Sequence, residues 1–146
     1  MTAGASSRLY TPDILALAVS LARFPLDPGL PFHGEARSRT CGSMLELGLS
    51  LDEVDRISGL GLHVRACAVG QAAAAIFAAD ATGRSADEID AAADAVENWL
   101  AGEGGQPSWR GIKTLVPARD YPARHGAILL PWKAAQAVLG KGAGAS

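Results

Sequence analysis

Two segments near the middle of the chain alternate apolar and polar residues in the way that is typical of β-strands. In residues 44–51 every second residue is a leucine: Leu45, Leu47, Leu49 and Leu51. In residues 54–66 the alternate positions include Leu60, Leu62, Val64 and Ala66. Successive side chains of a strand point to opposite faces, so each segment has one apolar face. We expect an antiparallel hairpin with one buried face, and residues 35–40 as a polar strand at its edge.

Most of the remaining chain has apolar residues at helical spacing. A first helix is expected to begin at Thr11-Pro12-Asp13, a cap followed by proline and an acid, and to end near Phe24-Pro25. Further helices are expected over residues 69–81, from the Ser85 capping box to about residue 101, and from about 122 to 139. Pro131 lies inside the last pattern and predicts a kink or a helix restart. A short irregular or helical piece is expected over residues 108–116.

These elements predict an α+β fold class: an N-terminal helix, a small antiparallel sheet of about three strands, then a C-terminal set of helices packed on one face. The chain has 146 residues, which favours one domain, expected over residues 11–140 with flexible tails at 1–10 and 141–146. The sequence holds 29 alanines, mostly in the predicted helices. We expect these helices to pack closely behind the sheet.

Charge argues against several classes of function. Thirteen basic residues stand against 15 acidic ones, for a net charge of −2, whereas nucleic-acid-binding domains are usually strongly basic. No apolar stretch is long enough to span a membrane, and the first residues do not resemble a secretory signal. We therefore expect no nucleic-acid or membrane partner, a cytoplasmic location and free thiols.

The candidate chemistry lies in the chain's two cysteines. Cys41 precedes the first predicted strand, and Cys67 follows the hairpin at the start of a helix, so both are expected at the same end of the sheet. The positive end of a helix favours a thiolate, and Arg65 would add to this effect. The two cysteines lack CxxC spacing, and free cysteines are also common as inert core residues, so both readings remain open.

Three local sequences carry a resemblance to a known family. They are Thr40-Cys41-Gly42-Ser43 before the first predicted strand, Ala66-Cys67-Ala68 at the end of the hairpin, and Ala123-Arg124-His125-Gly126-Ala127-Ile128-Leu129 at the start of the last helix. In this order they resemble the IscU/NifU-like family of iron–sulfur cluster assembly scaffolds, over about residues 9–139. The long segment between Cys67 and the last helix resembles the Suf-type branch of that family.

The resemblance implies a function and a site. It implies a non-enzymatic scaffold or carrier that transiently binds iron or a cluster, [2Fe–2S] first among the clusters, or zinc. The implied ligands are Cys41, Cys67 and His125. A cysteine desulfurase and iron–sulfur recipient proteins are the implied partners. Two positions depart from the family's pattern: Ser43 stands where the family has an aspartate, and Gly126 stands where it has a third cysteine.

Two other functions are compatible with the same residues. The first is a degenerate scaffold paralogue that binds partners without a cluster, with or without zinc, which the departures at Ser43 and Gly126 suggest. The second is a thiol enzyme with Cys67 as its nucleophile, for which His63 is the one candidate base on the same strand face.

Overall fold

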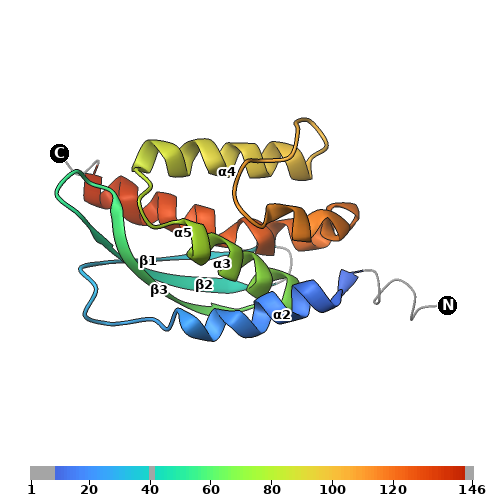
Figure 1. The fold of residues 1–146 in the computed structure, drawn as a ribbon, viewed down its shortest axis with the longest axis horizontal. Helices are drawn as coiled ribbons and strands as arrows, with labels where there is room; N and C mark the ends of the chain where they lie inside the picture. Colours follow the sequence, from blue (N-terminus) through green and yellow to red (C-terminus); the bar gives the residue numbers. More distant parts are fainter. Residues whose placement is uncertain (1–8, 40–41, 144–146) are drawn as a thin grey trace.

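A three-stranded antiparallel sheet forms one layer of the molecule, and helices cover one of its faces (Figure 1). The structure is a computed structural model that describes residues 9–39 and 42–143. Its elements in chain order are α2 (Pro12–Ser20), β1 (Phe32–Arg37), β2 (Met44–Leu51), β3 (Ile57–Arg65), α3 (Ala68–Asp80), α4 (Ala86–Leu100) and α5 (His125–Ala143). Short 3-10 helices span Leu21–Arg23, Ile112–Asp120 and Pro122–Arg124. The predicted α+β class and its order of elements are confirmed.

The strand register explains why one face of the sheet is apolar. The strands lie in the order β1-β2-β3, and Leu47 of β2 lies between Gly34 of β1 and Leu62 of β3. The neighbouring row on the same face joins Ala36, Leu45 and Val64. The leucines Leu45, Leu47 and Leu49 are fully buried. The opposite face carries Glu35, Glu46 and His63 in one row, so the predicted division into a buried and a polar face is confirmed.

The two edges of the sheet are finished differently. At β3 the chain after α2 runs alongside the strand: Pro25 forms a parallel bridge with Leu62, whose N–H donates to the Phe24 carbonyl over 2.8 Å. Gly61 permits this approach, because a Cβ there would meet the Pro25 backbone. At the other edge β1 begins at Phe32, three residues earlier than the polar edge strand expected over residues 35–40.

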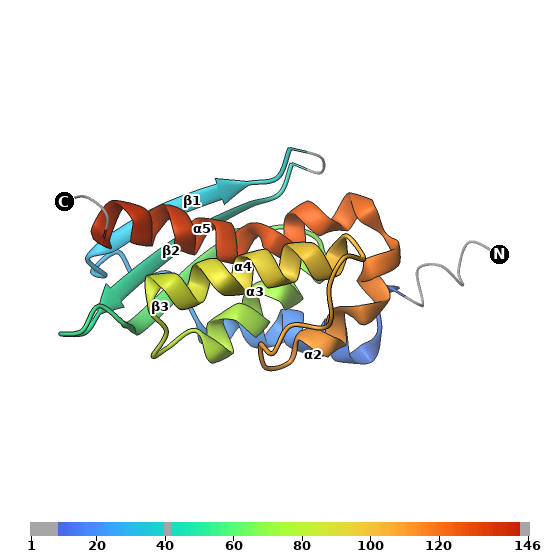
Figure 2. The same cartoon turned by 90° about the horizontal axis from the view of Figure 1, so that it is seen from above.

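Helix α3 lies at the centre of the molecule, against the sheet and between α2 and α5, and α4 packs on the outer side of α5 (Figures 1 and 2). Nine of its thirteen residues are buried, which decides that α3 is a core helix rather than a surface helix. They are Val69, Gly70, Ala72, Ala73, Ala74, Ala75, Ile76, Phe77 and Ala78. Small side chains let neighbouring backbones approach closely, so the predicted role of the alanines is confirmed for this helix.

Helix α4 begins at the predicted capping box. The Ser85 hydroxyl accepts a hydrogen bond from the Glu88 N–H, and the Glu88 carboxylate accepts one from the Ser85 N–H. The Ser85 backbone N–H and then the Arg56 guanidinium lower the pKa of the Glu88 carboxyl. Arg56 lies at the start of β3, so this contact ties the helix to the sheet.

Of the two outcomes predicted at Pro131, a kink or a helix restart, the restart is wrong. Pro131 lies inside α5, which continues without a restart from His125 to Ala143. Pro131 is buried, and its neighbour Trp132 is fully buried, so packing holds the helix together where one backbone hydrogen bond is missing. None of the helices described here is long and apolar enough to cross a membrane.

At the other end of the chain Leu9, expected in the tail, is buried against the core.

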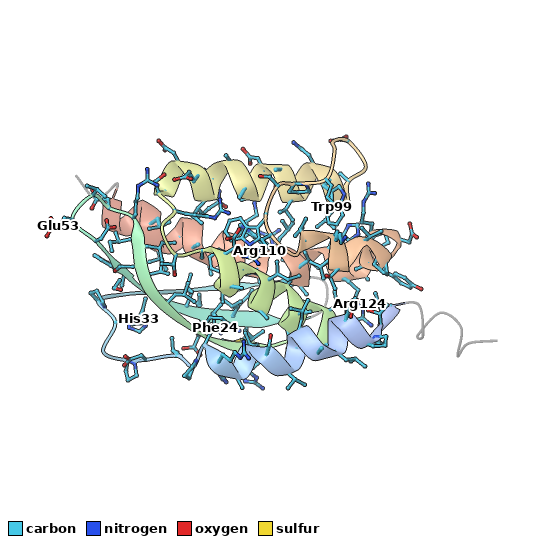
Figure 3. The ribbon with its side chains drawn as sticks, viewed as in Figure 1. Phe24, His33, Glu53, Trp99, Arg110 and Arg124 are labelled. Carbon is cyan, nitrogen blue, oxygen red and sulfur yellow. The ribbon has the colours of Figure 1, made fainter. Side chains whose placement is uncertain are left out.

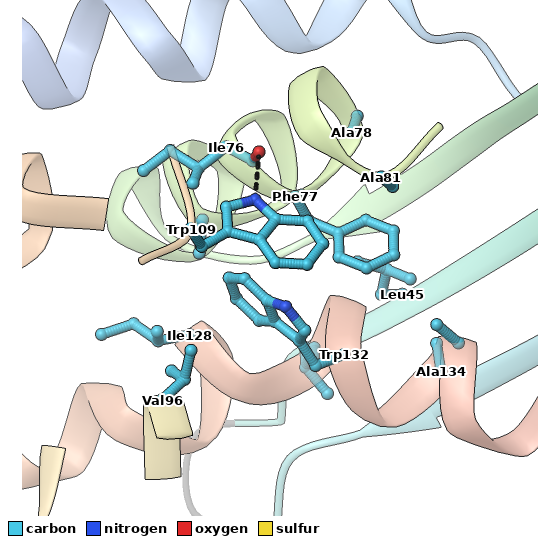
Figure 4. Packing of buried hydrophobic residues seen from close by; sticks show 14 of the residues in the cluster. Leu45, Ile76, Phe77, Ala78, Ala81, Val96, Trp109, Ile128, Trp132 and Ala134 are labelled. Atoms are coloured by element: carbon cyan, nitrogen blue, oxygen red, sulfur yellow. Dashed lines mark hydrogen bonds between the residues drawn. The ribbon is translucent and has the colours of Figure 1, made fainter. Parts of the chain in front are cut away.

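Three aromatic rings fill the space between α3, α5 and the segment before the 3-10 helix (Figure 4). Phe77 and Trp109 are stacked with ring centroids 5.5 Å apart, and Trp132 meets both rings edge-on. The Trp109 indole N–H donates to the Ile76 carbonyl over 3.0 Å. The indole N–H of Trp132 is buried and has no hydrogen-bond partner among the described residues. Two tryptophans of similar burial thus differ in one hydrogen bond.

This difference predicts unequal costs for the same substitution. Trp109→Phe should lower the free energy of unfolding by about 1–2 kcal/mol more than Trp132→Phe, because only the former removes a hydrogen bond. It also replaces the indole over which the Arg84 guanidinium lies, 4.0 Å from the centroid, with a smaller ring. Urea titrations of the two variants and the parent measure the difference. Equal costs, or a larger cost for Trp132→Phe, would contradict this account.

Candidate metal-binding site

The start of β2 and the end of β3 meet at one end of the sheet. Met44 pairs with Arg65, and on its other side with Arg37 at the end of β1. The β1–β2 connection is closed by a hydrogen bond from the Ser38 N–H to the Ser43 carbonyl over 2.8 Å. Cys41, a predicted ligand in this connection, lies outside the described residues.

Cys67 is the N-cap residue of α3, as predicted. Its backbone is extended, with φ −65° and ψ 171°, and its side chain makes no capping hydrogen bond. The thiol is free and half-buried. Gln71 secures the turn from strand to helix: its N–H donates to the Cys67 carbonyl over 3.0 Å, and its side-chain amide donates to the Ala66 carbonyl over 2.9 Å. The sulfur is therefore presented by a turn whose backbone is held on both sides.

His125 is the first residue of α5, near the predicted start of the last helix at about residue 122. Its Nε2 lies 3.0 Å from the Arg119 carbonyl oxygen. Because a carbonyl only accepts, Nε2 must carry the proton, and Nδ1 of the neutral ring keeps its lone pair. Histidines that bind metals usually donate their other ring N–H to a carbonyl or carboxylate in this way. The half-buried imidazole is thus oriented with one nitrogen able to bind a metal.

The first turns of α3 and α5 are in direct contact. A Cβ added to Gly70, three residues after Cys67, would lie 3.2 Å from the Ala127 Cβ and 2.7 Å from the Ala66 Cβ. Ala127 follows His125 by two residues, so the fold brings the two segments that carry these predicted ligands together. Thiolate and imidazole are the donors that zinc and iron–sulfur clusters use, so the two described side chains fit such a group.

The other histidines lie elsewhere. His63 is exposed on the polar face of the sheet, with Nδ1 3.7 Å from the Glu46 carboxylate, and the exposed His33 bonds the Leu30 carbonyl. His63 therefore lies next to Glu46 on the outer face of the sheet and does not belong to the candidate site. Within residues 9–39 and 42–143, no three histidine, cysteine, aspartate or glutamate side chains are grouped as a metal site would need.

Sequence reasoning missed two features of this region. One is Gly70, whose role could have been suspected from a glycine in the first turn of an alanine-rich helix. The other is a pocket beside Gly126, lined by basic residues of β1 and α5. Arg37 and Lys133 are 96 positions apart, and no local pattern joins them.

The fold matches a solved structure over almost the whole length of both chains. A NifU-like protein (N-terminal part) from Brucella abortus is 28% identical, with a TM-score of 0.88, and the match covers 97% of this chain and 99% of that one. The chain therefore has a NifU-like fold. The resemblance to the IscU/NifU-like family is thereby confirmed, whereas the roles of Cys41, Cys67 and His125 as ligands stay a prediction.

Two further solved structures have the same fold as this protein. One is described as a putative iron–sulfur cluster assembly scaffold protein for the SUF system of Fervidobacterium islandicum, with 22% identity, a TM-score of 0.81, and coverage of 92% and 98% of the two chains. The other is a hypothetical protein with 21% identity, a TM-score of 0.70, and coverage of 86% and 96%. No protein-family model and no curated protein matches the sequence.

The contact at Gly70 makes a prediction about this NifU-like fold. Glycine to alanine inside a helix normally stabilises by about 0.5–1 kcal/mol. Gly70→Ala should instead lower the free energy of unfolding by about 1–3 kcal/mol, because the new methyl would lie too close to the Ala66 Cβ before α3 and to the Ala127 Cβ of α5. Gly140→Ala in α5, where nothing lies within 4 Å of the added Cβ, should show the normal gain. Urea titration measures both; a gain at Gly70 would show that the junction has room.

Proposed function

We propose that this protein is a non-enzymatic iron–sulfur cluster scaffold or carrier, with Cys41, Cys67 and His125 as the ligands of its cargo. The observation that carries the proposal is the contact between the first turns of α3 and α5. Cys67, with a free half-buried thiol, lies at the start of α3, and His125, with an oriented imidazole, lies at the start of α5. The likeness to the NifU-like protein from Brucella abortus supports it, as does the scaffold description of the Fervidobacterium structure.

The donor set suits a cargo that is held and then released. Thiolates bind iron–sulfur clusters and zinc, and an imidazole that replaces a thiolate raises the reduction potential of a cluster. Four protein ligands are the norm for either group, and this chain offers three. A [2Fe–2S] cluster held by three protein ligands would keep one position open to solvent, a partner or a small ligand. We propose transient rather than permanent occupancy for this reason.

Partners follow from the role of a scaffold. We propose a cysteine desulfurase, of the SUF type, as the sulfur donor and iron–sulfur proteins as recipients, without nucleic acid or membrane. A free thiol at Cys67 suits a reducing compartment, and we place the protein in the cytoplasm.

A partner-binding module without a cluster is the second candidate. The residues at two positions favour it: Ser43 is 5% exposed, and Gly126 has no side chain to donate. In this case zinc, or no metal, would occupy the junction. A thiol enzyme has less support, since His63, the base proposed for it, is exposed on the polar face of the sheet, opposite the face that the helices cover.

Anaerobic reconstitution with iron and sulfide tests the scaffold proposal. The parent should gain the visible absorption of a cluster, whereas Cys41→Ala and Cys67→Ala should lose it. His125→Ala should bind Zn²⁺ at least about tenfold more weakly, since even an outer partner of a metal ligand commonly contributes that much. Spectra that are equal in the parent and both cysteine variants would overturn the proposal.

His63→Ala is the matched control for His125→Ala, because His63 is exposed and lies on the polar face of the sheet. It should bind Zn²⁺ like the parent. If capture of a cysteine desulfurase survives both cysteine substitutions while no cluster forms on the parent, the partner-binding module is the better description.

A further inference from the structure

A pocket of about 310 Å³ opens between the end of β1 and the first turns of α5. Its lining combines an apolar floor with three cations and one glycine. The residues are Arg37, Ser38, Arg39, Gly126, Leu129 and Lys133, with Pro122 and Leu130 beside them. No acidic side chain lines it. A volume near 300 Å³ is the lower end of the range for small-molecule sites, so the space suits a small anion with some apolar character.

The three cations are available to a ligand. Arg37 lies 3.6 Å from Glu35, and Lys133 lies 3.4 Å from Glu97, with all four side chains between 45 and 69% exposed. Exposed ion pairs of this kind contribute about 0–1 kcal/mol, so both cations can turn to a ligand at little cost. Arg39 is exposed and makes no ion pair within the described part of the chain.

Two groups of acidic residues lie outside the lining of this pocket, although Glu97 of the second group reaches Lys133 at its rim. One group, around Glu53, lies in the β2–β3 turn, and Figure 3 shows Glu53 and Arg124 at opposite ends of the molecule. A second group lies on the exposed side of α4: Asp87, Glu88, Asp90, Asp94 and Glu97. The lining of the pocket is thus basic, with three cations and no acid, although the net charge of the chain is −2.

Gly126 connects the pocket to the metal-binding junction. It is the residue after His125, with Cα atoms about 3.8 Å apart, and it lines the pocket without contributing a side chain. The proposed ligand set is one donor short of four. A ligand seated in the pocket with a sulfur at Gly126 would lie beside His125 and could supply that donor.

We propose that this pocket binds a small anionic thiol, a molecule with one or more carboxylates and one sulfhydryl, whose thiolate completes the coordination of the cargo. Its carboxylates pair with Arg37, Arg39 and Lys133, and its sulfur takes the space that Gly126 leaves. The thiol proton passes to solvent when sulfur binds the metal, and no oxidation is involved. This inference rests on the proposed function for the role of the thiol, but not for the binding of the anion.

Glutathione, S-methylglutathione and 2-mercaptoethanol are the probes. Titration of the metal-free protein, followed by backbone NMR, should shift signals of residues 37–39 and 126–133 with glutathione and with S-methylglutathione, but not with the uncharged 2-mercaptoethanol. Arg39→Gln should weaken this binding about tenfold, the loss typical of one charge-assisted contact. Arg65→Gln, outside the pocket, is the matched control and should bind like the parent.

Cobalt(II), a coloured substitute for zinc, reports the sulfur. In the cobalt-loaded parent, glutathione should strengthen the thiolate-to-cobalt absorption, and S-methylglutathione should not. Gly126→Cys supplies the missing thiolate from the chain, so its band should be strong at once and insensitive to glutathione. Equal effects of the two glutathiones on the parent would overturn the thiolate role.

The two proposals fail in different ways. A cobalt band that needs Cys67 but does not respond to glutathione overturns this inference and leaves the scaffold function standing. Absence of the NMR shifts also overturns it, whatever metal is bound. Absence of any cobalt or cluster binding overturns the scaffold function and, with it, the role given to the thiol.

Discussion

The burial of α3 on nearly all sides is the constraint on which the other elements depend. A helix that touches a sheet and two other helices can do so only if its side chains are short, and five of the buried residues of α3 are alanines. Alanine buries little area per residue, so the alanines of α3 add little hydrophobic stabilisation. The larger contribution comes from Phe77 of α3 together with the helix's neighbours, the leucines of β2 and the rings of Trp109 and Trp132.

The same constraint places the site. Because Gly70 has no side chain, the first turns of α3 and α5 lie in van der Waals contact. The Cys67 thiol and the His125 imidazole are carried by the starts of these two helices. Groups on rigid elements keep their geometry better than groups on loops. The bonds of Gln71 to Ala66 and of His125 to Arg119 add local support from beyond the two helices.

The parts of the fold with local signals were predictable, and those governed by distant packing were not. The alternation in β2 and the caps at Thr11 and Ser85 each lie within a few residues, and the structure has these elements. The continuity of α5 through Pro131 depends on the surrounding core and could not be read locally. Of the predicted ligands, Cys67 and His125 stand at the helix starts that the sequence indicated. The pocket at Gly126 joins residues of opposite ends of the chain, for which one sequence contains no signal.

The unequal edges of the sheet limit how copies of this chain can associate. Phe24 and Pro25 pair with Leu62 in the middle of the free side of β3, whereas in the described structure nothing pairs with the outer side of β1. An exposed edge is a template for another strand. If two copies joined antiparallel through β1, the exposed β1 edge of each copy would be paired with the other. Such a two-fold contact leaves no β1 edge for a third copy. Growth into a fibre needs two open edges on each chain, and this fold leaves one.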